Sequence, residues 1–367
     1  MLSLVVLVLG SVRFARYDWS GIPLDRAPAV TSQRVSDGCL ERIEPYLTES
    51  GREISPTVVD EQQYLSMIER FRGTPDSELQ VECLYEPFTR RVGAPWLASL
   101  LPVEEGLALG LVNTGFLLLA LWVVLATLRD EGHDPRTLLV AGVLFAVSWN
   151  TLMFGTSLLA ETGPLAAVAL CWFALVRRRP WWTLPVVVIG VLFKEVVLVV
   201  LPVIWADAAI HRRDDPSRTT RFLPAYAPAI GSTVCALAAL AAGLALGPPA
   251  AAAWPGSPSV SVAISNLDPV GLIVLAIGVG PVLVPAILWW WHRRSSVGSL
   301  RATADPAVVG LLVGFVVLAW SALTADLSPR HYWPFFPFAV TLAARWFSQG
   351  RPRDWLERLP VPAALVH

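Results

Sequence analysis

Charged residues are scarce in this sequence of 367 residues, and lysine is almost absent from it. Only 16% of the residues are Asp, Glu, Lys or Arg, whereas about 25% is usual in a soluble domain. Lys194 is the single lysine, so arginine supplies the rest of the basic charge. This shortage excludes an ordinary soluble globular domain. A formal net charge of −1 also gives no reason to expect a nucleic-acid partner.

Cysteine is also rare, with four residues in the chain. Cys171 and Cys235 lie inside apolar runs, where we expect them to pack as small hydrophobic residues. Cys39 and Cys83 lie in a long polar segment. A disulfide between them remains open, because it depends on whether that segment faces an oxidising compartment.

Several catalytic and binding motifs are missing from the sequence. It has no P-loop, no GxGxxG ahead of a helix, no HExxH, no GxSxG and no Cys/His cluster. The polar segment also contains no Asp-x-Asp pair of the kind that binds a divalent metal. We therefore expect neither a nucleotide cofactor nor a metal site.

Long apolar runs dominate what is present, since 54% of the residues are hydrophobic and the mean hydropathy is +0.56. A transmembrane helix needs about 20 apolar residues. The sequence therefore predicts an all-α polytopic membrane protein with about ten transmembrane or half-membrane helices. The apolar runs cover residues 107–128, 137–154, 160–176, 181–206, 222–247, 269–291, 307–325 and 331–347.

Composition divides the chain into four parts. Residues 1–14 form an N-terminal membrane segment that is short for a full span, and a signal peptide is the alternative interpretation. Residues 15–105 form a long extracytoplasmic loop, 106–348 the multi-span domain and 349–367 a cytoplasmic tail. Within the loop, helical spacing of apolar residues predicts an amphipathic helix on the membrane surface at 60–72 and a short one at 92–101.

The run 181–206 is either one tilted span or a hairpin that breaks at Lys194-Glu195. Arginine positions favour the hairpin, because cytoplasmic loops carry an excess of Arg and Lys. With a hairpin, the arginine-rich loops near 129–136, 177–179, 212–221, 293–301 and 345–358 all fall on one side. The opposite, extracytoplasmic side then carries segment 60–102, turn 155–163, the Lys194-Glu195 tip, the Pro-rich loop 248–268 and turn 328–332.

Asp60 and Glu61 are the candidate catalytic carboxylates. Partial burial raises the pKa of one member of a neighbouring acid pair, which suits it to act as a general base. The alternative interpretation is a helix N-terminal turn, where the helix dipole stabilises acids.

Three further ionisable residues lie within or beside apolar runs. Lys194 and Glu195 interrupt such a run, and ionisable groups at membrane depth usually mark a site or pathway. The simpler interpretation is a self-neutralising pair at a hairpin tip. Glu161 is either a turn residue near water or a second carboxylate at the rim of a cavity.

Arginines on the extracytoplasmic side are candidate phosphate ligands, because a planar guanidinium binds two oxygens at once. Arg330 with His331 is one candidate, and Arg90 with Arg91 is the other. The alternative for each pair is contact with lipid headgroups at the interface. Two aromatic residues, Tyr64 and Trp96, are candidates for stacking on a sugar ring.

At these residues the sequence resembles the GT-C glycosyltransferases, integral membrane enzymes that use polyprenyl-phosphate sugars as donors. The resemblance rests on short motifs and on the layout of the spans. The motifs are Asp60-Glu61-Gln62-Gln63-Tyr64, Glu86-Pro87-Phe88-Thr89-Arg90-Arg91, Ala94-Pro95-Trp96-Leu97-Ala98, Phe193-Lys194-Glu195 and Pro329-Arg330-His331-Tyr332. The soluble C-terminal domain of the larger members is not matched here.

The resemblance implies a general base at Asp60, with Glu61 as its substitute, and contact between turn 329–332 and the lipid phosphate. It also implies a polyprenyl-phosphate sugar donor and a glycan, lipid or protein acceptor, in a bacterial cytoplasmic membrane with the active face outside. A transporter or lipid flippase is the rival of another class, and a non-catalytic assembly subunit is the third possibility.

Overall fold

The computed structural model describes residues 46–47, 53–54, 59–75, 84–155, 158–214, 222–250, 252–253, 258–324 and 328–349. The predicted membrane segment at 1–14, the cysteines Cys39 and Cys83, and the tail beyond residue 349 lie outside these residues. The described chain is almost entirely helical. Its few strands are two residues long: β1 (Tyr46–Leu47) pairs antiparallel with β2 (Glu53–Ile54), and β3 (Tyr85–Glu86) pairs parallel with β4 (Ala252–Ala253).

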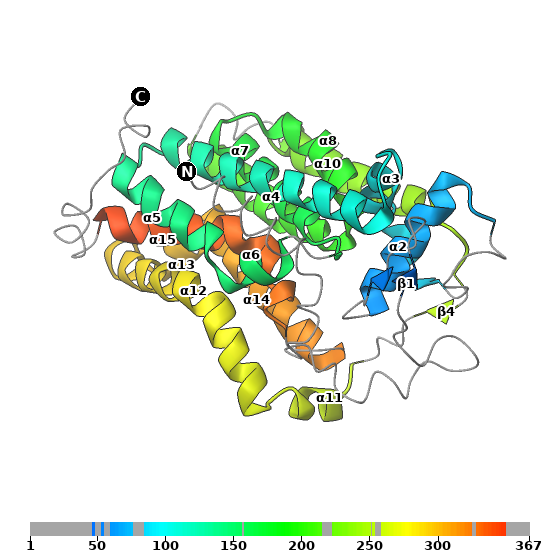
Figure 1. Ribbon diagram of the computed structural model, residues 1–367. Coiled ribbons are helices and arrows are strands. Elements are labelled where there is room, and N and C mark those ends of the chain that lie inside the picture. The colour runs from blue at the N-terminus through cyan, green and yellow to red at the C-terminus, as the bar shows by residue number, and fades with distance from the viewer. Residues whose placement is uncertain are drawn as a thin grey trace.

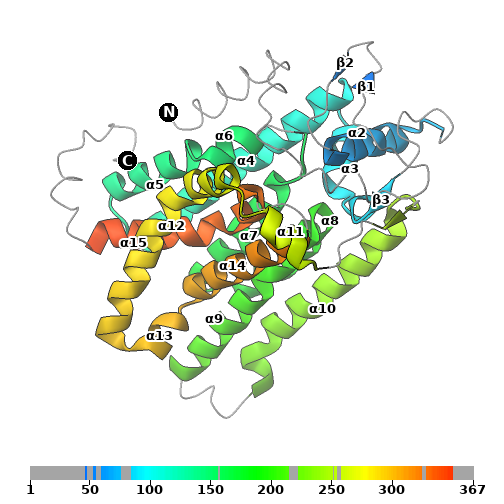
Figure 2. The same ribbon diagram turned by 90° about the horizontal axis from the view of Figure 1, so that it is seen from below.

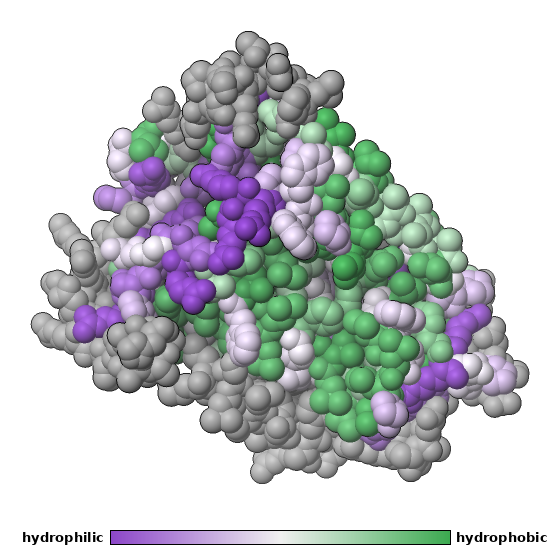
Figure 3. Space-filling view, turned by 90° about the horizontal axis from the view of Figure 1, so that it is seen from above, coloured by the Kyte–Doolittle hydropathy of each residue, from purple (hydrophilic) through white to green (hydrophobic). Residues whose placement is uncertain are grey.

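Four of the described helices are long and apolar enough to cross a membrane. They are α4 (Glu105–Asp130), α10 (Phe222–Leu246), α12 (Pro269–Val297) and α14 (Pro306–Thr324). Large apolar side chains on these helices are exposed, among them Trp122, Val234, Ile273 and Val316. Figure 3 shows hydrophobic residues gathered over a broad part of one face of the molecule. The chain is therefore an α-helical membrane protein.

Shorter helices fill the space between the long ones. The predicted run 137–154 is divided into α5 (Pro135–Ala146) and α6 (Trp149–Phe154). The division falls at Ser148, whose hydroxyl accepts from the Thr151 backbone N–H at 3.3 Å and starts a new helix. The remaining buried helices are α7 (Thr162–Val176) and α15 (Phe336–Gln349), and Trp172 of α7 donates to Thr341 of α15 at 3.1 Å.

The segment 181–206 folds as the predicted hairpin. The α8 helix (Thr183–Phe193) is followed by a 3-10 helix, η5 (Glu195–Val200), and by α9 (Leu201–Asp214). Thr183 at the start of α8 lies 2.8 Å from Ser232 on α10, and Trp205 in α9 donates to the adjacent Thr233 at 3.2 Å. Thr183 and Trp205 lie far apart in the segment but contact neighbouring residues of α10. The chain must therefore reverse its direction between them. Figure 2 shows α10 running along both helices.

The helix predicted on the membrane surface is instead buried within the protein. It is α2 (Val59–Arg72), and every residue from 61 to 69 is buried. Its neighbours are α3 (Gly93–Ser99), the 3-10 helix η3 (Phe88–Arg90) and the start of α4. Arg72 fixes its end by donating to Glu105 at 2.8 Å and to the Leu101 carbonyl at 2.9 Å. The spacing of the apolar residues predicted the helix correctly. It did not predict that other segments of the chain cover the polar face of the helix.

Contacts gather the arginine-rich loops at one end of the molecule, which we call the α15 end. Arg177 binds Asp130, Arg178 lies 3.2 Å from His211, and Arg345 binds both Glu131 and Asp305. Figure 1 shows α5 and α15 at this end, while α2 and α3 lie at the opposite one, the α2 end. The described parts of the loops that the hairpin topology assigned to one side therefore lie together. The other described elements are η4 (Pro180–Trp182), α11 (Val260–Ser265), α13 (Ser299–Thr303), η7 (Pro329–His331) and η8 (Trp333–Phe335).

Candidate functional site

Six charged side chains from separate parts of the chain meet at the α2 end. We call them the charged cluster: Asp60, Arg91, Glu161, Lys194, Glu195 and Arg330. They form three ion pairs, Asp60–Arg330, Glu161–Lys194 and Arg91–Glu195. Three acids balance three bases, so the cluster carries no net charge. Such a balance lets charged groups lie beside apolar helices.

The pair between Asp60 and Arg330 joins residues that are 270 positions apart in the sequence. Nη1 of Arg330 lies 3.4 Å from Oδ2 of Asp60, and the side chains are 12% and 16% exposed. Asp60 lies in the first turn of α2 and Arg330 in η7. The acidic loop and the late Arg-His turn therefore share one site, which any joint role for them requires.

The turn that carries Arg330 is held from two sides. The Asn150 side chain of α6 donates to the Pro329 carbonyl at 3.3 Å, and the Ser328 hydroxyl accepts from the Arg330 backbone N–H at 3.4 Å. Gly278 of α12 lies against Pro329 so closely that an added Cβ would be 2.6 Å from the proline ring. Packing and hydrogen bonds thus fix the position of the guanidinium.

Glu161 and Lys194 form the most deeply buried pair of the cluster, with side chains 3% and 12% exposed. Asn113 of α4 positions the turn that carries Glu161. Its amide donates to the Leu159 carbonyl at 2.7 Å and its oxygen accepts from the Thr162 hydroxyl at 2.9 Å. Sequence reasoning missed Asn113, although an amide inside the apolar run 107–128 was a signal for it.

Arg91 is bound from two directions. It donates to both carboxylate oxygens of Glu195, with Nε 3.0 Å from Oε2, and its Nη1 lies 3.3 Å from the Tyr64 hydroxyl. Burial raises the pKa of the Tyr64 phenol, so the hydroxyl stays protonated at neutral pH. The Tyr64 ring is 1% exposed and packs edge-on against Phe88 at 5.9 Å. A sugar cannot stack on a ring that the protein covers, so Tyr64 supports Arg91 instead.

Phe193 fixes the hairpin tip in place. Its ring fills the space beside two glycines, where an added Cβ would lie 2.8 Å from it at Gly93 and 2.2 Å at Gly163. It also packs edge-on against Phe116 at 4.7 Å. Because Lys194 and Glu195 follow directly, this packing sets the position of one cation and one anion of the cluster.

Four other candidate residues lie outside the cluster. Arg90 pairs with Glu86 and lines a separate pocket. Trp96 is 50% exposed on the outer face of α3, and Glu61 is buried on α2. His331 is partly buried and acts electrostatically on Glu161. The predicted set is thus split. The three ion pairs lie together, Tyr64 and His331 adjoin them, and Arg90, Trp96 and Glu61 are not part of the cluster.

No protein-family model, curated protein or solved structure matches this chain. Function must therefore be argued from the site itself. The cluster combines a carboxylate at a helix start with a guanidinium at hydrogen-bonding distance, both partly accessible. This arrangement suits an anionic ligand at Arg330 together with proton acceptance at Asp60. Among the described residues, no group of three or more His, Cys, Asp or Glu could hold a metal ion.

Proposed function

We propose that the protein is a membrane glycosyltransferase of the GT-C type. It moves a sugar from a polyprenyl-phosphate donor to a hydroxyl of a glycan, lipid or protein acceptor. In this proposal about ten membrane segments lie in a bacterial cytoplasmic membrane, and the α2 end faces outward. The observation that carries the proposal is the meeting of Asp60 with Arg330 inside a neutral cluster of buried charges.

The reaction assigns one role to each member of this pair. The acceptor hydroxyl oxygen attacks the anomeric carbon of the donor sugar and forms the new C–O bond. The bond from that carbon to the phosphate oxygen breaks, and the polyprenyl phosphate leaves with the electron pair. Asp60 accepts the proton of the attacking hydroxyl, a contribution of about 10²–10⁴-fold for a general base. Arg330 stabilises the charge that develops on the leaving phosphate.

The remaining charges position these two residues. Arg91 binds both carboxylate oxygens of Glu195 and the Tyr64 hydroxyl, and Lys194 binds Glu161. We assign the phosphate to Arg330 because it pairs with the proposed base Asp60. Arg330 meets Asp60 at 3.4 Å, a long contact compared with about 2.7–2.9 Å for a strong charge-assisted hydrogen bond. A phosphate that takes over Arg330 also releases the Asp60 carboxylate for proton transfer.

One observation favours the rival interpretation as a transporter or flippase. The helix breaks at Lys194, between α8 and η5, and broken helices with ionisable residues are typical of transport sites. Movement of a labelled polyprenyl-phosphate sugar across sealed vesicles, without formation of a glycosidic bond, supports this rival. Formation of a glycoside in detergent solution, where no compartments exist, supports the transferase.

The test is Asp60→Asn in purified protein supplied with polyprenyl-phosphate sugars and candidate acceptors. We expect transfer to fall by about 10²-fold or more while donor binding is retained. Glu61→Gln tests the substitute base, and we expect little loss because Glu61 is not in the cluster. Asp268→Asn is the matched control, since Asp268 only caps α12 on the surface. Unchanged transfer in Asp60→Asn removes this residue from the mechanism.

A further inference from the structure

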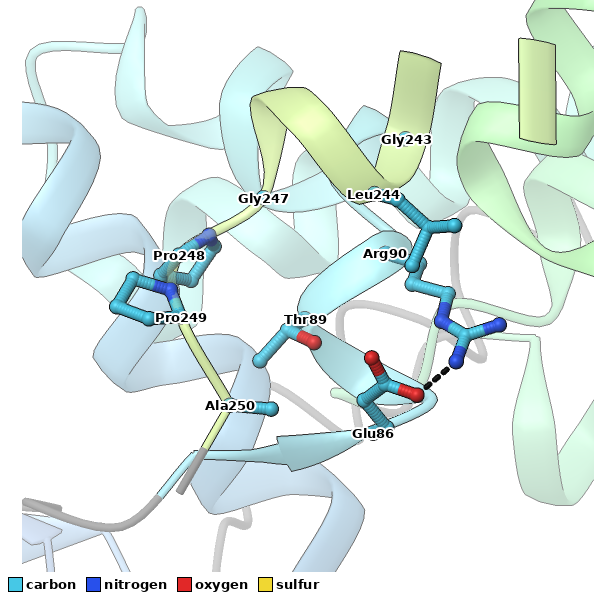
Figure 4. Close-up of a pocket in the computed structure, with 9 residues that line it drawn as sticks. All are labelled: Glu86, Thr89, Arg90, Gly243, Leu244, Gly247, Pro248, Pro249 and Ala250. Atoms are coloured by element: carbon cyan, nitrogen blue, oxygen red, sulfur yellow. Dashed lines mark hydrogen bonds and ion pairs between the residues drawn. The ribbon is translucent and has the colours of Figure 1, made fainter. Parts of the chain in front are cut away.

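A second site lies beside the charged cluster. It is a pocket of about 330 Å³ between η3, the end of α10 and the turn that follows it, and Figure 4 shows its lining. Small-molecule sites run from about 300 to 1,000 Å³, so this volume suits one small ring. The lining residues are Glu86, Thr89, Arg90, Gly243, Leu244, Gly247, Pro248, Pro249 and Ala250.

Two consecutive arginines separate the pocket from the cluster. Arg91 turns into the cluster and binds Glu195, whereas Arg90 turns into the pocket and binds Glu86. The pocket and the proposed reaction site therefore share one stretch of backbone.

The charge of the pocket disfavours an anion. The Glu86 carboxylate neutralises Arg90, with which it is paired. The C-terminal end of α10 is at the pocket, and a helix carries about −0.5 elementary charge at that end because its last carbonyls lack partners. The net charge around the pocket is therefore slightly negative. This argues against the phosphate contact that the sequence suggested for Arg90. Because the Glu86–Arg90 pair cancels its own charge, the small charge that is left suits a neutral ligand.

The polar groups of the pocket suit a ligand rich in hydroxyls. Figure 4 shows the Thr89 hydroxyl and the Glu86–Arg90 pair directed at the same space. They offer a donor, an acceptor and a group that does both. Pro248 and Pro249 form an apolar wall without N–H groups. A sugar ring has this same combination of polar edges and an apolar C–H face.

The wall of the pocket is closely packed. An added Cβ at Gly247 would lie 1.9 Å from the Thr89 carbonyl oxygen, and one at Gly243 would lie 3.0 Å from the Arg90 carbonyl oxygen. These glycines let the end of α10 approach η3 directly, and the parallel pairing of β3 with β4 ties the following turn to Glu86. The site is thus built into the fold.

We propose that this pocket binds a neutral sugar ring of the acceptor, next to the ring that reacts at Asp60. The assignment to the acceptor rests on the proposed transferase function. Neutral-sugar binding itself does not, because it follows from the volume, charge and lining of the pocket alone.

The experiment measures binding by saturation-transfer NMR with the full chain in lipid nanodiscs, which avoids maltoside detergents that are themselves glycosides. The probes are the methyl glycosides of glucose, galactose, mannose and arabinose, with inorganic phosphate and spermidine as charged probes. Ala250→Phe fills the pocket from an exposed position. Leu246→Phe is the matched control, because Leu246 is 62% exposed nearby and does not line the pocket.

We expect at least one neutral glycoside to bind, Ala250→Phe to weaken it by about tenfold, equivalent to 1.4 kcal/mol, and Leu246→Phe to leave it unchanged. Asp60→Asn should bind the glycoside normally. The proposal is overturned if no glycoside binds with a Kd in the millimolar range, where 1 mM corresponds to about −4.1 kcal/mol. It is also overturned if Ala250→Phe binds like the parent protein, or if phosphate or spermidine displaces the glycoside.

The two proposals fail in different ways. Sugar binding that depends on Ala250, without any transfer, removes the acceptor assignment and the transferase but leaves a sugar site. Transfer that depends on Asp60, without sugar binding in the pocket, leaves the transferase and removes this inference.

Discussion

The two ends of the molecule each bury arginine beside carboxylates, but they do so differently. At the α15 end, Arg345 makes four N–O contacts of 2.8–3.3 Å with Glu131 and Asp305. Its guanidinium also lies over the Trp289 ring, 5.4 Å from the centroid. At the α2 end, Arg330 meets Asp60 at 3.4 Å. Both arginine side chains are mostly buried, 17% exposed for Arg345 and 12% for Arg330, so the difference lies in the number and length of these carboxylate contacts.

This difference distinguishes an arginine that stabilises the fold from an arginine that can take part in a functional site. Arg345 joins the loop after α4, the start of α14 and α15, so its pairs hold three helices together. A fully bound guanidinium has little left to offer a ligand. The Asp60–Arg330 pair joins fewer packed elements and sits among other charges that balance it. We therefore expect substitutions at the α15 end to lower mainly stability and substitutions at the α2 end to lower mainly activity.

The largest contrast in stability is expected between Arg345→Met and Arg330→Met. Removing Arg345 takes the guanidinium from two mostly buried carboxylates, Asp305 and Glu131, of which Glu131 keeps a second partner in His133, and this costs about 3 kcal/mol of unfolding free energy. Removing Arg330 takes the partner from one carboxylate, Asp60, instead of two, and we expect a smaller cost of about 1–2 kcal/mol. It lowers transfer by about 10²-fold, the usual loss for one group that stabilises charge in the transition state. Thermal unfolding and transfer assays on both variants measure this. Equal destabilisation by the two variants would contradict the contrast.

A smaller effect is expected at the hairpin tip. Gly163→Ala places a methyl group against the buried Phe193 ring, and overpacking of this kind costs about 1–3 kcal/mol. The shift also moves Lys194 away from Glu161, so transfer should fall as well. Gly115→Ala is the control, because nothing lies within 4 Å of its added Cβ on α4. If both variants unfold like the parent protein, Phe193 does not hold the tip.

The smallest effect is a pH dependence confined to the α15 end. Burial raises the pKa of Glu131, but hydrogen bonds and charge from His133 and Arg345 outweigh it and hold the pKa below its usual value. A carboxyl with a depressed pKa stabilises the fold above its unfolded pKa of about 4.3, and this contribution is lost as the pH falls through the folded value. The difference in thermal midpoint between the parent protein and Glu131→Gln should therefore shrink below about pH 4.3. A difference that does not shrink at all between about pH 4.3 and pH 3 (roughly a unit lower) would contradict this account of Glu131.

The long helices were readable from the sequence because each is an unbroken apolar run. The predicted runs 222–247 and 307–325 agree with α10 and α14 to within a residue at each end. The hairpin at Lys194 was also predicted, from the distribution of arginines among the loops. Both predictions depend only on the composition of one segment or on the number of arginines in each loop.

The environment of α2 could not be predicted in this way. Its spacing indicated one apolar face, yet Gln62, Gln63 and Ser66 are buried as well. What covers a helix depends on segments remote in sequence. The same applies to the partners in the cluster. The sequence singled out Glu161, Lys194, Arg91 and Glu195, but only the three-dimensional arrangement pairs Lys194 with Glu161 rather than with its neighbour Glu195.

The most direct measurement for the central claim is a double-mutant cycle on transfer with Asp60→Asn and Arg330→Gln. Residues that act on one reaction at one site are coupled, by about 0.5–3 kcal/mol for groups in contact. We predict that the double variant transfers sugar at nearly the rate of the slower single variant. Independent, multiplicative losses would show that the two residues act separately and would contradict a shared site.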